Sequence, residues 1–311
     1  MNKNLLLLIS VLIMIVLTLT GVFFYKTYIK KNSVSLPAAQ VIQKTLPLRQ
    51  SAIPNYDHIV ILIMENKTTG DIIGNQSAPF INSIAKQNSL ATNYSAIANP
   101  SLPNYLSLIG GDTFGITSDC TNCFVSSNSL VDRLEQNHKS WKAYMESMPS
   151  SCFIGDDYPY AQKHNPFVYF NNIRNNPDRC KKIVSLDELS KDLTAPASAP
   201  NFIWITPNMC HDMHDCSVSQ GDTWLSQEVP QILNSPIFKL QKSLLILTWD
   251  EGESSSNNVT TILIGSGVKQ DFSSNTAYTH YSLLKTVETA WNLSALTVND
   301  TNAESMNDFF R

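Results

Sequence analysis

Two adjacent carboxylates follow an apolar run in the stretch LLILTWDEG, residues 244–252. The run Leu244 to Trp249 lacks polar alternation, which is typical of a strand buried on both faces of a parallel sheet. Ligand sites in such sheets lie at the carboxyl ends of strands. Asp250 and Glu251 would lie at such an end, where they could bind a metal ion or exchange protons. The alternative is that they are ordinary loop carboxylates at the start of a turn at Gly252.

Polar side chains also follow two other apolar runs. The run from His58 to Met64 is followed by Glu65 and Asn66. The run from Phe202 to Thr206 leads into TPNMCHDMHDC, which contains His211, Asp212, His214 and Asp215. If the strands are parallel, these groups meet at one edge of the sheet, where carboxylate and amide oxygens can bind a divalent cation.

Ser101 is the candidate nucleophile. It lies in NPSLPNYLSLIGG, where Pro100 and Pro103 stiffen the backbone around its hydroxyl. The residues after it predict a helix that ends at the glycine pair 110–111. A loop serine between two prolines is the competing interpretation.

The positions of these groups depend on the elements that carry them. A fourth strand is expected at residues 260–264, and helices are expected at residues 79–90, 129–146, 221–233 and 281–291. Alternating strands and helices predict an α/β fold, with a mainly parallel sheet and helices on both faces. Residues 120–194 are rich in Asn, Pro and aromatic side chains, and we interpret them as an irregular insertion or cap on the same domain.

The N-terminal segment from Leu5 to Tyr25 contains 21 residues without a charge, enough to cross a bilayer as a helix. No small-x-small cleavage site follows it, which favours an uncleaved signal anchor over a cleaved signal peptide. Three lysines follow the segment and one precedes it, a bias that by itself would place the rest of the chain in the cytoplasm. The expected organisation is an anchor at residues 1–31, a polar linker at 32–54 and one domain at 55–311.

The six cysteines favour the opposite location. All lie after residue 119, in three near pairs: Cys120 and Cys123, Cys152 and Cys180, Cys210 and Cys216. An even number behind an export signal indicates disulfides, although six cysteines allow 15 connectivities. Zinc binding or redox chemistry at CTNC is the alternative, but no second CxxC accompanies it. Three short-range disulfides would place the domain outside the cytoplasm.

The charge balance argues against nucleic acid as a partner. Four of the 22 basic residues and none of the 26 acidic residues precede Asn32, so the rest of the chain has a net charge of about −8. It shows no basic stripe of the kind that follows a phosphate backbone.

Five blocks together carry a family resemblance. They are HIVILIMEN, NPSLPNYLSLIGG, PNMCHDMHD followed by GDTWL, LTWDEG, and YTHYSLLKTVE, spread over about residues 56–293. In this order they resemble the bacterial phosphoesterase family that contains secreted acid phosphatases and phospholipases C, a branch of the alkaline phosphatase superfamily. The resemblance implies an alkaline-phosphatase-like α/β fold and metal-supported phosphoryl transfer.

The resemblance also implies roles for individual residues. Glu65 with Asn66, and Asp250 with Glu251, match metal-binding pairs of the family, and Ser101 matches its metal-bound nucleophile. The block with His211, Asp212, His214 and Asp215 matches residues that contact the phosphate or protonate the leaving group, and His280 matches a further histidine motif. Structural roles are expected for His58, His138 and His164.

These features predict metal-dependent hydrolysis of phosphate monoesters through a phosphoserine at Ser101, with phosphoinositides and other lipid phosphates among the candidate substrates. One divalent metal ion is expected, and the ligand types leave Ca, Mg, Mn, Zn and Fe open. The expected partners are the phosphate ester substrate and a membrane at residues 5–25. A phospholipase C-type phosphodiesterase is the first alternative, and a non-catalytic surface binding protein on the same scaffold is the second.

Overall fold

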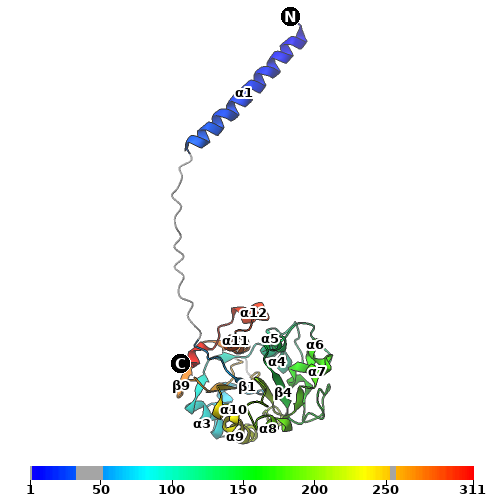
Figure 1. Cartoon of the computed structure of the whole chain (residues 1–311), viewed down its shortest axis with the longest axis vertical. Coiled ribbons are helices and arrows are strands. Elements are labelled where there is room, and N and C mark those ends of the chain that lie inside the picture. Colours follow the sequence, from blue (N-terminus) through cyan, green and yellow to red (C-terminus); the bar gives the residue numbers. More distant parts are fainter. Residues whose placement is uncertain (1, 33–51, 253–256) are drawn as a thin grey trace. The chain divides into compact units, whose positions relative to one another are not determined.

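The computed structural model describes residues 2–32, 52–252 and 257–311, which divide into an N-terminal helix and a folded domain. The helix is α1 (Lys3–Asn32), and its part Leu12–Lys31 is the one helix of the described residues long and apolar enough to cross a membrane (Figure 1). Large apolar side chains of this helix, among them Leu12, Phe23 and Phe24, are exposed. Of the predicted linker, residues 33–51 lie outside the described residues.

The described part of the folded domain contains an eight-stranded sheet in the order β5-β4-β6-β1-β7-β8-β2-β9. Neighbouring strands are parallel except for the two pairs that β8 forms with β7 and β2. The predicted mainly parallel sheet is therefore confirmed. The strands are β1 (His58–Met64), β2 (Ser89–Ala91), β4 (Trp141–Met145), β5 (Ile183–Ser185), β6 (Phe202–Thr206), β7 (Ser243–Trp249), β8 (Thr261–Gly265) and β9 (Phe272–Ser274), and a small parallel pair is formed by β3 (Tyr94–Ser95) and β10 (Tyr278–Thr279).

The central strands β1 and β7 are buried along their whole length. Their apolar residues face covering layers on both sides, which suits the middle of a parallel sheet. The register pairs Met64 with Trp249, so the two strands end together. The backbone N–H of Asp250 continues the ladder by donating to the carbonyl oxygen of Met64, at 3.0 Å. Residues 65 and 250 therefore leave the sheet side by side.

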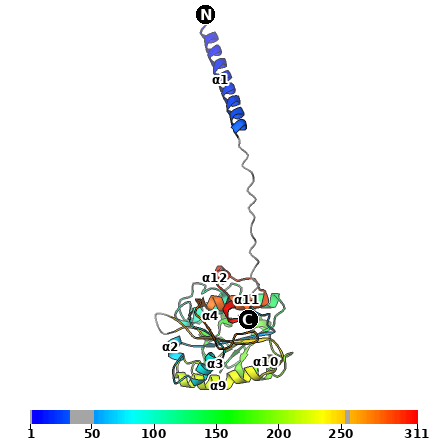
Figure 2. The ribbon, with the colours of Figure 1, turned by 90° about the vertical axis from the view of Figure 1, so that its left-hand side faces the viewer.

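Helices cover both faces of this sheet, as Figure 2 shows. One side carries α4 (Ser101–Gly110), α11 (His280–Trp291) and α12 (Val298–Asn302), and the other carries α2 (Thr69–Ile72), α3 (Pro79–Gln87), α9 (Val218–Asn234) and α10 (Pro236–Leu240). All ten residues of α4 are buried, so its N-terminus can present a side chain only to the protein interior. The helix ends at Gly110 and is followed by Gly111, whose φ of 72° suits glycine, as the glycine pair predicted.

Residues 120–194, which we call the cap, contain more regular structure than expected. Helix α5 (Leu130–Gln136) begins near the predicted start of the helix 129–146, but the second half of that prediction is wrong. The chain turns at His138, which has a φ of 56°, and continues as β4, which pairs with β6. Aromatic residues favour a strand there, because Trp141 and Tyr144 are buried in the sheet layer.

The cap also contains several short helices, and one more lies near the C-terminus. They are η1 (Gln162–His164), η2 (Pro166–Tyr169), α6 (Asn171–Arg174), α7 (Pro177–Cys180), η3 (Leu186–Glu188), α8 (Leu189–Asp192) and η4 (Asn307–Phe309). Disulfides join all three predicted cysteine pairs: Cys120 with Cys123, Cys152 with Cys180, and Cys210 with Cys216. Two of them constrain the cap, and the third closes the loop after β6.

A buried acid in α11 makes stability depend on pH. Glu288 is 1% exposed, and burial together with Asp300 raises its pKa to about 9. The folded state therefore retains a proton that the unfolded state loses above its ordinary pKa near 4.5, and this group lowers the free energy of unfolding as pH rises from about 4.5 towards 9. We expect Glu288→Gln to be more stable than the wild type at pH 8, by about 1–3 kcal/mol, and to differ little at pH 4.

Urea unfolding followed by tryptophan fluorescence at both pH values measures this difference. The exposed Glu304→Gln is the matched control, which should keep the wild-type dependence on pH. An equal loss of stability with rising pH in Glu288→Gln and the wild type would contradict a protonated Glu288.

Candidate active site

Ser101 is the first residue of α4, and its side chain is enclosed by acidic groups. The residue is 1% exposed, and its Oγ lies 3.1 Å from Glu65 Oε2 and 3.4 Å from Glu251 Oε1. Because α4 begins at this residue, the positive end of the helix dipole lies at the hydroxyl, where an anionic group is favoured. The structure thus brings the predicted nucleophile together with acids that follow β1 and β7.

The ends of β1 and β7 are connected by their polar residues. The backbone N–H of Asn66 donates to Asp250 Oδ1 at 3.2 Å. Asn66 has a φ of 53°, a conformation that asparagine tolerates better than most residues. The backbone N–H of Glu65 donates to the carbonyl oxygen of Asp212 at 2.9 Å, which ties the end of β1 to the loop after β6. The ends of β1 and β7 are therefore joined to each other and to the loop after β6, and Glu65 and Glu251 from these ends contact Ser101.

The carboxyl groups of this site are crowded and buried. Burial is the main cause that raises the pKa of Glu65 and of Asp212 well above the ordinary range. Burial also raises the pKa of Asp250 to about 7 and, with the charge of Asp250, that of Glu251 to about 8. Three of their oxygens, Glu65 Oε1, Asp212 Oδ2 and Asp250 Oδ2, are buried without a hydrogen-bond partner among the described residues. Buried carboxylates in this state fit a divalent cation, which would replace the missing partners.

Lys163 of the cap supplies a positive charge that the sequence did not predict. Its Nζ lies 3.0 Å from Asp119 Oδ2 and 3.0 Å from His214 Nε2. Burial lowers its pKa, but Asp119, Glu65 and Asp250 outweigh burial and leave the pKa raised. Asp119 Oδ1 in turn accepts the backbone N–H of Leu102 at 3.0 Å, so this ion pair is fixed to the first turn of α4.

His214 is held in a defined orientation. Its Nδ1 lies 2.7 Å from Asp215 Oδ1, and its backbone N–H donates to Asp212 Oδ1 at 2.7 Å. The disulfide between Cys210 and Cys216 closes the loop that carries all three residues. With Nδ1 directed to Asp215, Nε2 faces Lys163 and the interior of the site.

His164 lies in the active site, although a structural role was expected for it. Its Nε2 is 3.1 Å from Glu65 Oε1, and its Nδ1 is 3.2 Å from Asp212 Oδ2. The ring stacks on Tyr105 of α4, with centroids 5.3 Å apart. Burial, followed by the charges of Lys163 and His214, lowers its pKa well below the ordinary value. In the sequence, His164 lies in the polar run KHN before a proline. The spacing of this run from the strand 58–64 does not predict that the two are close together.

Two predicted histidines have other surroundings. His211 Nδ1 lies 2.8 Å from Glu146 Oε1, and the ring stacks on Trp224, so it faces away from the groups around Ser101. His280 is fully buried between Tyr94 Oη, at 3.0 Å, and the backbone carbonyl oxygen of Asp250, at 2.5 Å. Both ring nitrogens of His280 therefore have hydrogen-bond partners, and the contact with its carbonyl oxygen holds the backbone of Asp250 in place.

Asn104 is a further residue that the sequence analysis missed. Its Oδ1 accepts the backbone N–H groups of Ile97 and Ala98, at 3.0 and 2.9 Å. Its Nδ2 lies 3.4 Å from Glu251 Oε2. The side chain therefore fixes the loop before Ser101 and positions one acid of the site.

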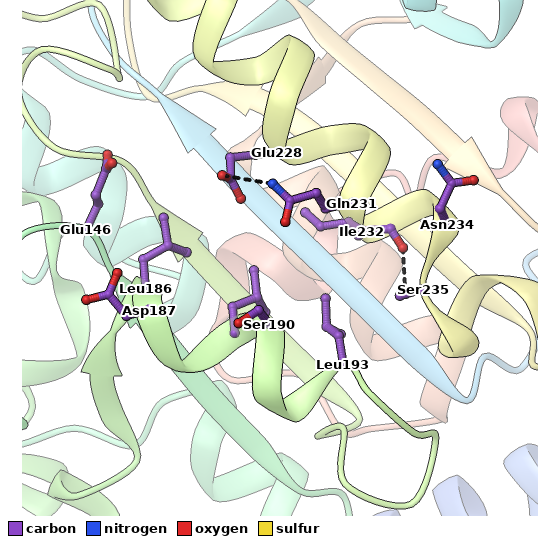
Figure 3. A pocket seen from close by; sticks show the side chains of 11 residues that line it. Glu146, Leu186, Asp187, Ser190, Leu193, Glu228, Gln231, Ile232, Asn234 and Ser235 are labelled. Carbon is purple, nitrogen blue, oxygen red and sulfur yellow. Dashed lines mark hydrogen bonds between the residues drawn. The ribbon is translucent and has the colours of Figure 1, made fainter.

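Two cavities differ in their relation to these residues. One of about 210 Å³ adjoins the site, because Asp119 and Lys163 form part of its wall together with Tyr158, Tyr160 and Met209. Another of about 510 Å³ lies between α8 and α9, and its lining includes Glu146, Glu228 and Ser190 but none of the groups around Ser101 (Figure 3). The smaller cavity is therefore the better candidate for the part of a substrate that extends from the site.

Comparisons with known proteins identify the family. The model of the Phosphoesterase family matches residues 74–294. A phosphatidylinositol-3-phosphatase of Mycobacterium tuberculosis is 35% identical over 271 residues, which cover 85% of this chain and 86% of the relative. A phosphate-repressible acid phosphatase of Penicillium chrysogenum is 34% identical over 228 residues, which cover 70% of this chain but 55% of the relative.

Solved structures with the same fold have low sequence identity. A protein of the alkaline phosphatase superfamily from Vibrio parahaemolyticus gives a TM-score of 0.58 at 10% identity, over 82% of this chain and 71% of the other. The lipoteichoic acid synthase LtaP from Listeria monocytogenes gives 0.56 at 11% identity, over 85% and 77%. These structures confirm the alkaline-phosphatase-like fold. The family match and the curated relatives establish that the chain belongs to the Phosphoesterase family and is a phosphoric ester hydrolase.

Proposed function

We propose that this protein hydrolyses phosphate monoesters outside the cytoplasm, through a phosphoserine at Ser101 and with a divalent metal ion. The observation that supports this most directly is the buried Ser101 hydroxyl, which lies at the N-terminus of α4 within 3.4 Å of carboxylates from two strand ends. The Mycobacterium relative supports a lipid phosphate, and specifically a phosphoinositide, as the substrate class. The helix α1 would tether the domain to the membrane, and the disulfides favour an oxidising compartment.

Glu65, Asn66, Asp250 and Glu251, together with Ser101, would hold the metal ion. These donors are all oxygen groups, which suit Ca²⁺, Mg²⁺ or Mn²⁺. When bound, the ion lowers the pKa of the serine hydroxyl and offsets negative charge on the phosphoryl group.

The remaining steps follow from the chain's own groups. Ser101 Oγ gives its proton to Glu65 Oε2, which accepts its hydrogen bond at 3.1 Å, and attacks phosphorus; a new P–O bond forms, and the bond to the departing alcohol breaks. The N-terminus of α4 and the Lys163 ammonium offset charge on the phosphoryl oxygens. Asp215 fixes the ring of His214 by its contact with Nδ1. His214 Nε2 therefore lies beside Lys163, where it can stabilise or protonate the departing oxygen. Water then hydrolyses the phosphoserine and restores the hydroxyl.

Replacement of the nucleophile tests the first step. We expect Ser101→Ala to lower kcat on p-nitrophenyl phosphate by at least about 10³-fold, because the variant lacks the hydroxyl that attacks phosphorus. The assay uses the full chain in detergent, across pH 5–8, with and without chelator and single divalent metals. Chelation should abolish wild-type activity, and one metal should restore it.

The outcomes separate the proposal from its alternatives. Undiminished turnover by Ser101→Ala would contradict the phosphoserine. Turnover of bis-p-nitrophenyl phosphate alone would indicate a phosphodiesterase, whose second substituent would need the cavity beside Lys163. No turnover of either ester in any metal would favour the non-catalytic binding protein.

The two histidines of the loop after β6 should behave differently. We expect His214→Ala to lower kcat by about 10²–10⁴-fold, because its Nε2 faces the reacting group. We expect His211→Ala to retain kcat and instead to lose about 1 kcal/mol of stability, because it contacts Glu146 and Trp224. Steady-state kinetics and urea unfolding of both variants measure this. A large loss of kcat in His211→Ala with little effect in His214→Ala would reverse the assignment.

A further inference from the structure

The cavity beside Lys163, which we call the side pocket, lies where three segments of the chain meet. Its walls come from the loop after α4, from residues 156–163 of the cap and from the loop after β6. The backbone N–H of Met209, in the loop after β6, donates to the carbonyl oxygen of Pro159 at 2.9 Å. This hydrogen bond joins two of the walls, so the pocket is held by the fold itself.

Lys163 belongs both to the side pocket and to the active site. Its Nζ lies 3.0 Å from His214 Nε2, the atom proposed to face the departing oxygen. Asp119, in the same pocket wall, accepts the backbone N–H of Leu102 in the first turn of α4. A substrate with its phosphoryl group at Ser101 would therefore extend its alcohol part into the side pocket.

The volume of the side pocket limits the size of that alcohol. The pocket measures about 210 Å³, less than the cavities of about 300–1,000 Å³ that enclose drug-sized ligands. It has room for one six-membered ring. A nucleoside, which has both a base and a sugar, is too large for it.

Two tyrosine rings give the pocket flat walls. Tyr160 is 4% exposed, and its Oη accepts a hydrogen bond from Asn165 Nδ2 at 2.9 Å, which fixes the ring. Tyr158 is 71% exposed and lies in a turn closed by two backbone hydrogen bonds between Asp157 and Tyr160, at 3.2 and 2.9 Å. Flat aromatic faces of this kind suit the face of a ring better than a branched chain.

Asp156 determines which groups that ring should carry. Its Oδ1 accepts the backbone N–H of Gln162 at 2.8 Å, which orients the carboxylate in the pocket wall. An ionised carboxylate can only accept hydrogen bonds. A ligand that fills the pocket must therefore offer donors to Asp156, and the hydroxyl groups of a polyol are such donors.

The charges of the pocket wall are not balanced. Lys163 and Asp119 pair with each other at 3.0 Å. Asp156 forms no ion pair with another described residue, and Asp157 adds a further acid next to it in the chain. A second phosphate group placed on the ring near Asp156 would face like charge, which disfavours binding.

We propose that the side pocket binds the departing alcohol as a polyhydroxylated six-membered ring, with Tyr158 and Tyr160 against its face and Asp156 accepting hydrogen bonds from its hydroxyl groups. Asp156 thereby disfavours rings in which a second phosphate monoester replaces one of these hydroxyls. The inference rests on the proposed phosphatase function and names the residues that select its substrate. A free cyclitol phosphate and a lipid headgroup share this chemistry, and the headgroup would keep its bond to the lipid outside the pocket.

The first experiment compares soluble esters on the full chain in detergent. They are myo-inositol 1-phosphate, cyclohexyl phosphate, which has the same ring size without hydroxyls, and ethyl phosphate, which has no ring. We expect wild-type kcat/KM to be at least about tenfold higher for the inositol ester than for the cyclohexyl ester, because a site built for hydroxyl groups rejects analogues without them. Tyr158→Ala should lower the ratio of inositol ester to ethyl phosphate by about five- to tenfold, and Tyr158→Phe, which keeps the ring, should retain it.

The second experiment isolates the charge of Asp156. It adds myo-inositol 1,4-bisphosphate and measures release of the first phosphate. We expect Asp156→Asn to raise kcat/KM for the bisphosphate relative to the monophosphate by about tenfold, because it removes the like charge. The matched control Asp157→Asn removes a charge outside the pocket wall and should keep this ratio within about twofold of the wild type.

Three results would overturn the proposal. One is an equal change of the ratio in Asp156→Asn and Asp157→Asn. Another is a Tyr158→Ala variant that lowers turnover of all three esters alike. The third is a wild type without preference for the inositol ester over the cyclohexyl ester.

Failure of the proposed phosphatase function gives a different result. Full activity of Ser101→Ala with the expected ratios would contradict the phosphoserine alone. If the wild type hydrolyses no ester, equilibrium dialysis of radiolabelled myo-inositol 1-phosphate against Ser101→Ala decides. We expect an added Tyr158→Ala to weaken this binding by about five- to tenfold, and no binding, or binding indifferent to Tyr158, would overturn the side pocket.

The source of the ring is tested with a phosphatidylinositol monophosphate in mixed micelles. Whichever of the lipid and the free ester has the higher wild-type kcat/KM is the preferred source. We expect the effect of Tyr158→Ala to recur on that source, because the ring is common to both. An effect on neither would contradict the assignment.

Discussion

Glu65 and Asp250 lie side by side because β1 and β7 end in the same register, and this places buried negative charge at the centre of the molecule's reactive edge. The register runs from His58 with Ser243 to Met64 with Trp249, so the chain leaves both strands at the same level. The acids that follow are consequently forced together, together with Glu251 and Asp212. Repulsion and burial raise the pKa of these acids, and the N-terminus of α4 and the Lys163 ammonium place positive charge beside them.

The helix α4 adapts the same edge to phosphoryl chemistry. It is buried over its whole length, so the fold dictates where its first residue lies. Ser101 occupies that position, and Asn104 one turn later holds both the preceding loop and Glu251. A hydroxyl, a helix N-terminus and carboxylates from two strand ends thus converge through a small number of buried contacts.

The sequence predicted the parts of this arrangement that depend on local pattern. The strands 58–64 and 202–206 have the predicted bounds, and the helix after Ser101 ends at the glycine pair, because hydrophobic runs and glycine signals are read within a few residues.

His164 and Lys163 could not be placed in this way. They enter the site through the path of the cap, which is determined by tertiary contacts such as the stacking of His164 on Tyr105. The strand β4 was missed for the same reason, since pairing with β6 overrides the helical pattern before it. His211 shows the opposite error: it is three residues from His214, yet the tight disulfide loop turns it towards Glu146.

The most direct test of the central claim is to quench wild-type protein with acid during turnover of a phosphate monoester and to map phosphorylation by peptide mass spectrometry. We expect one phosphoryl group on Ser101, formed only when substrate and metal are both present. A phosphoryl group on another hydroxyl residue instead, or steady product release without any phosphorylated Ser101 peptide, would contradict a serine nucleophile positioned by the acids that follow β1 and β7.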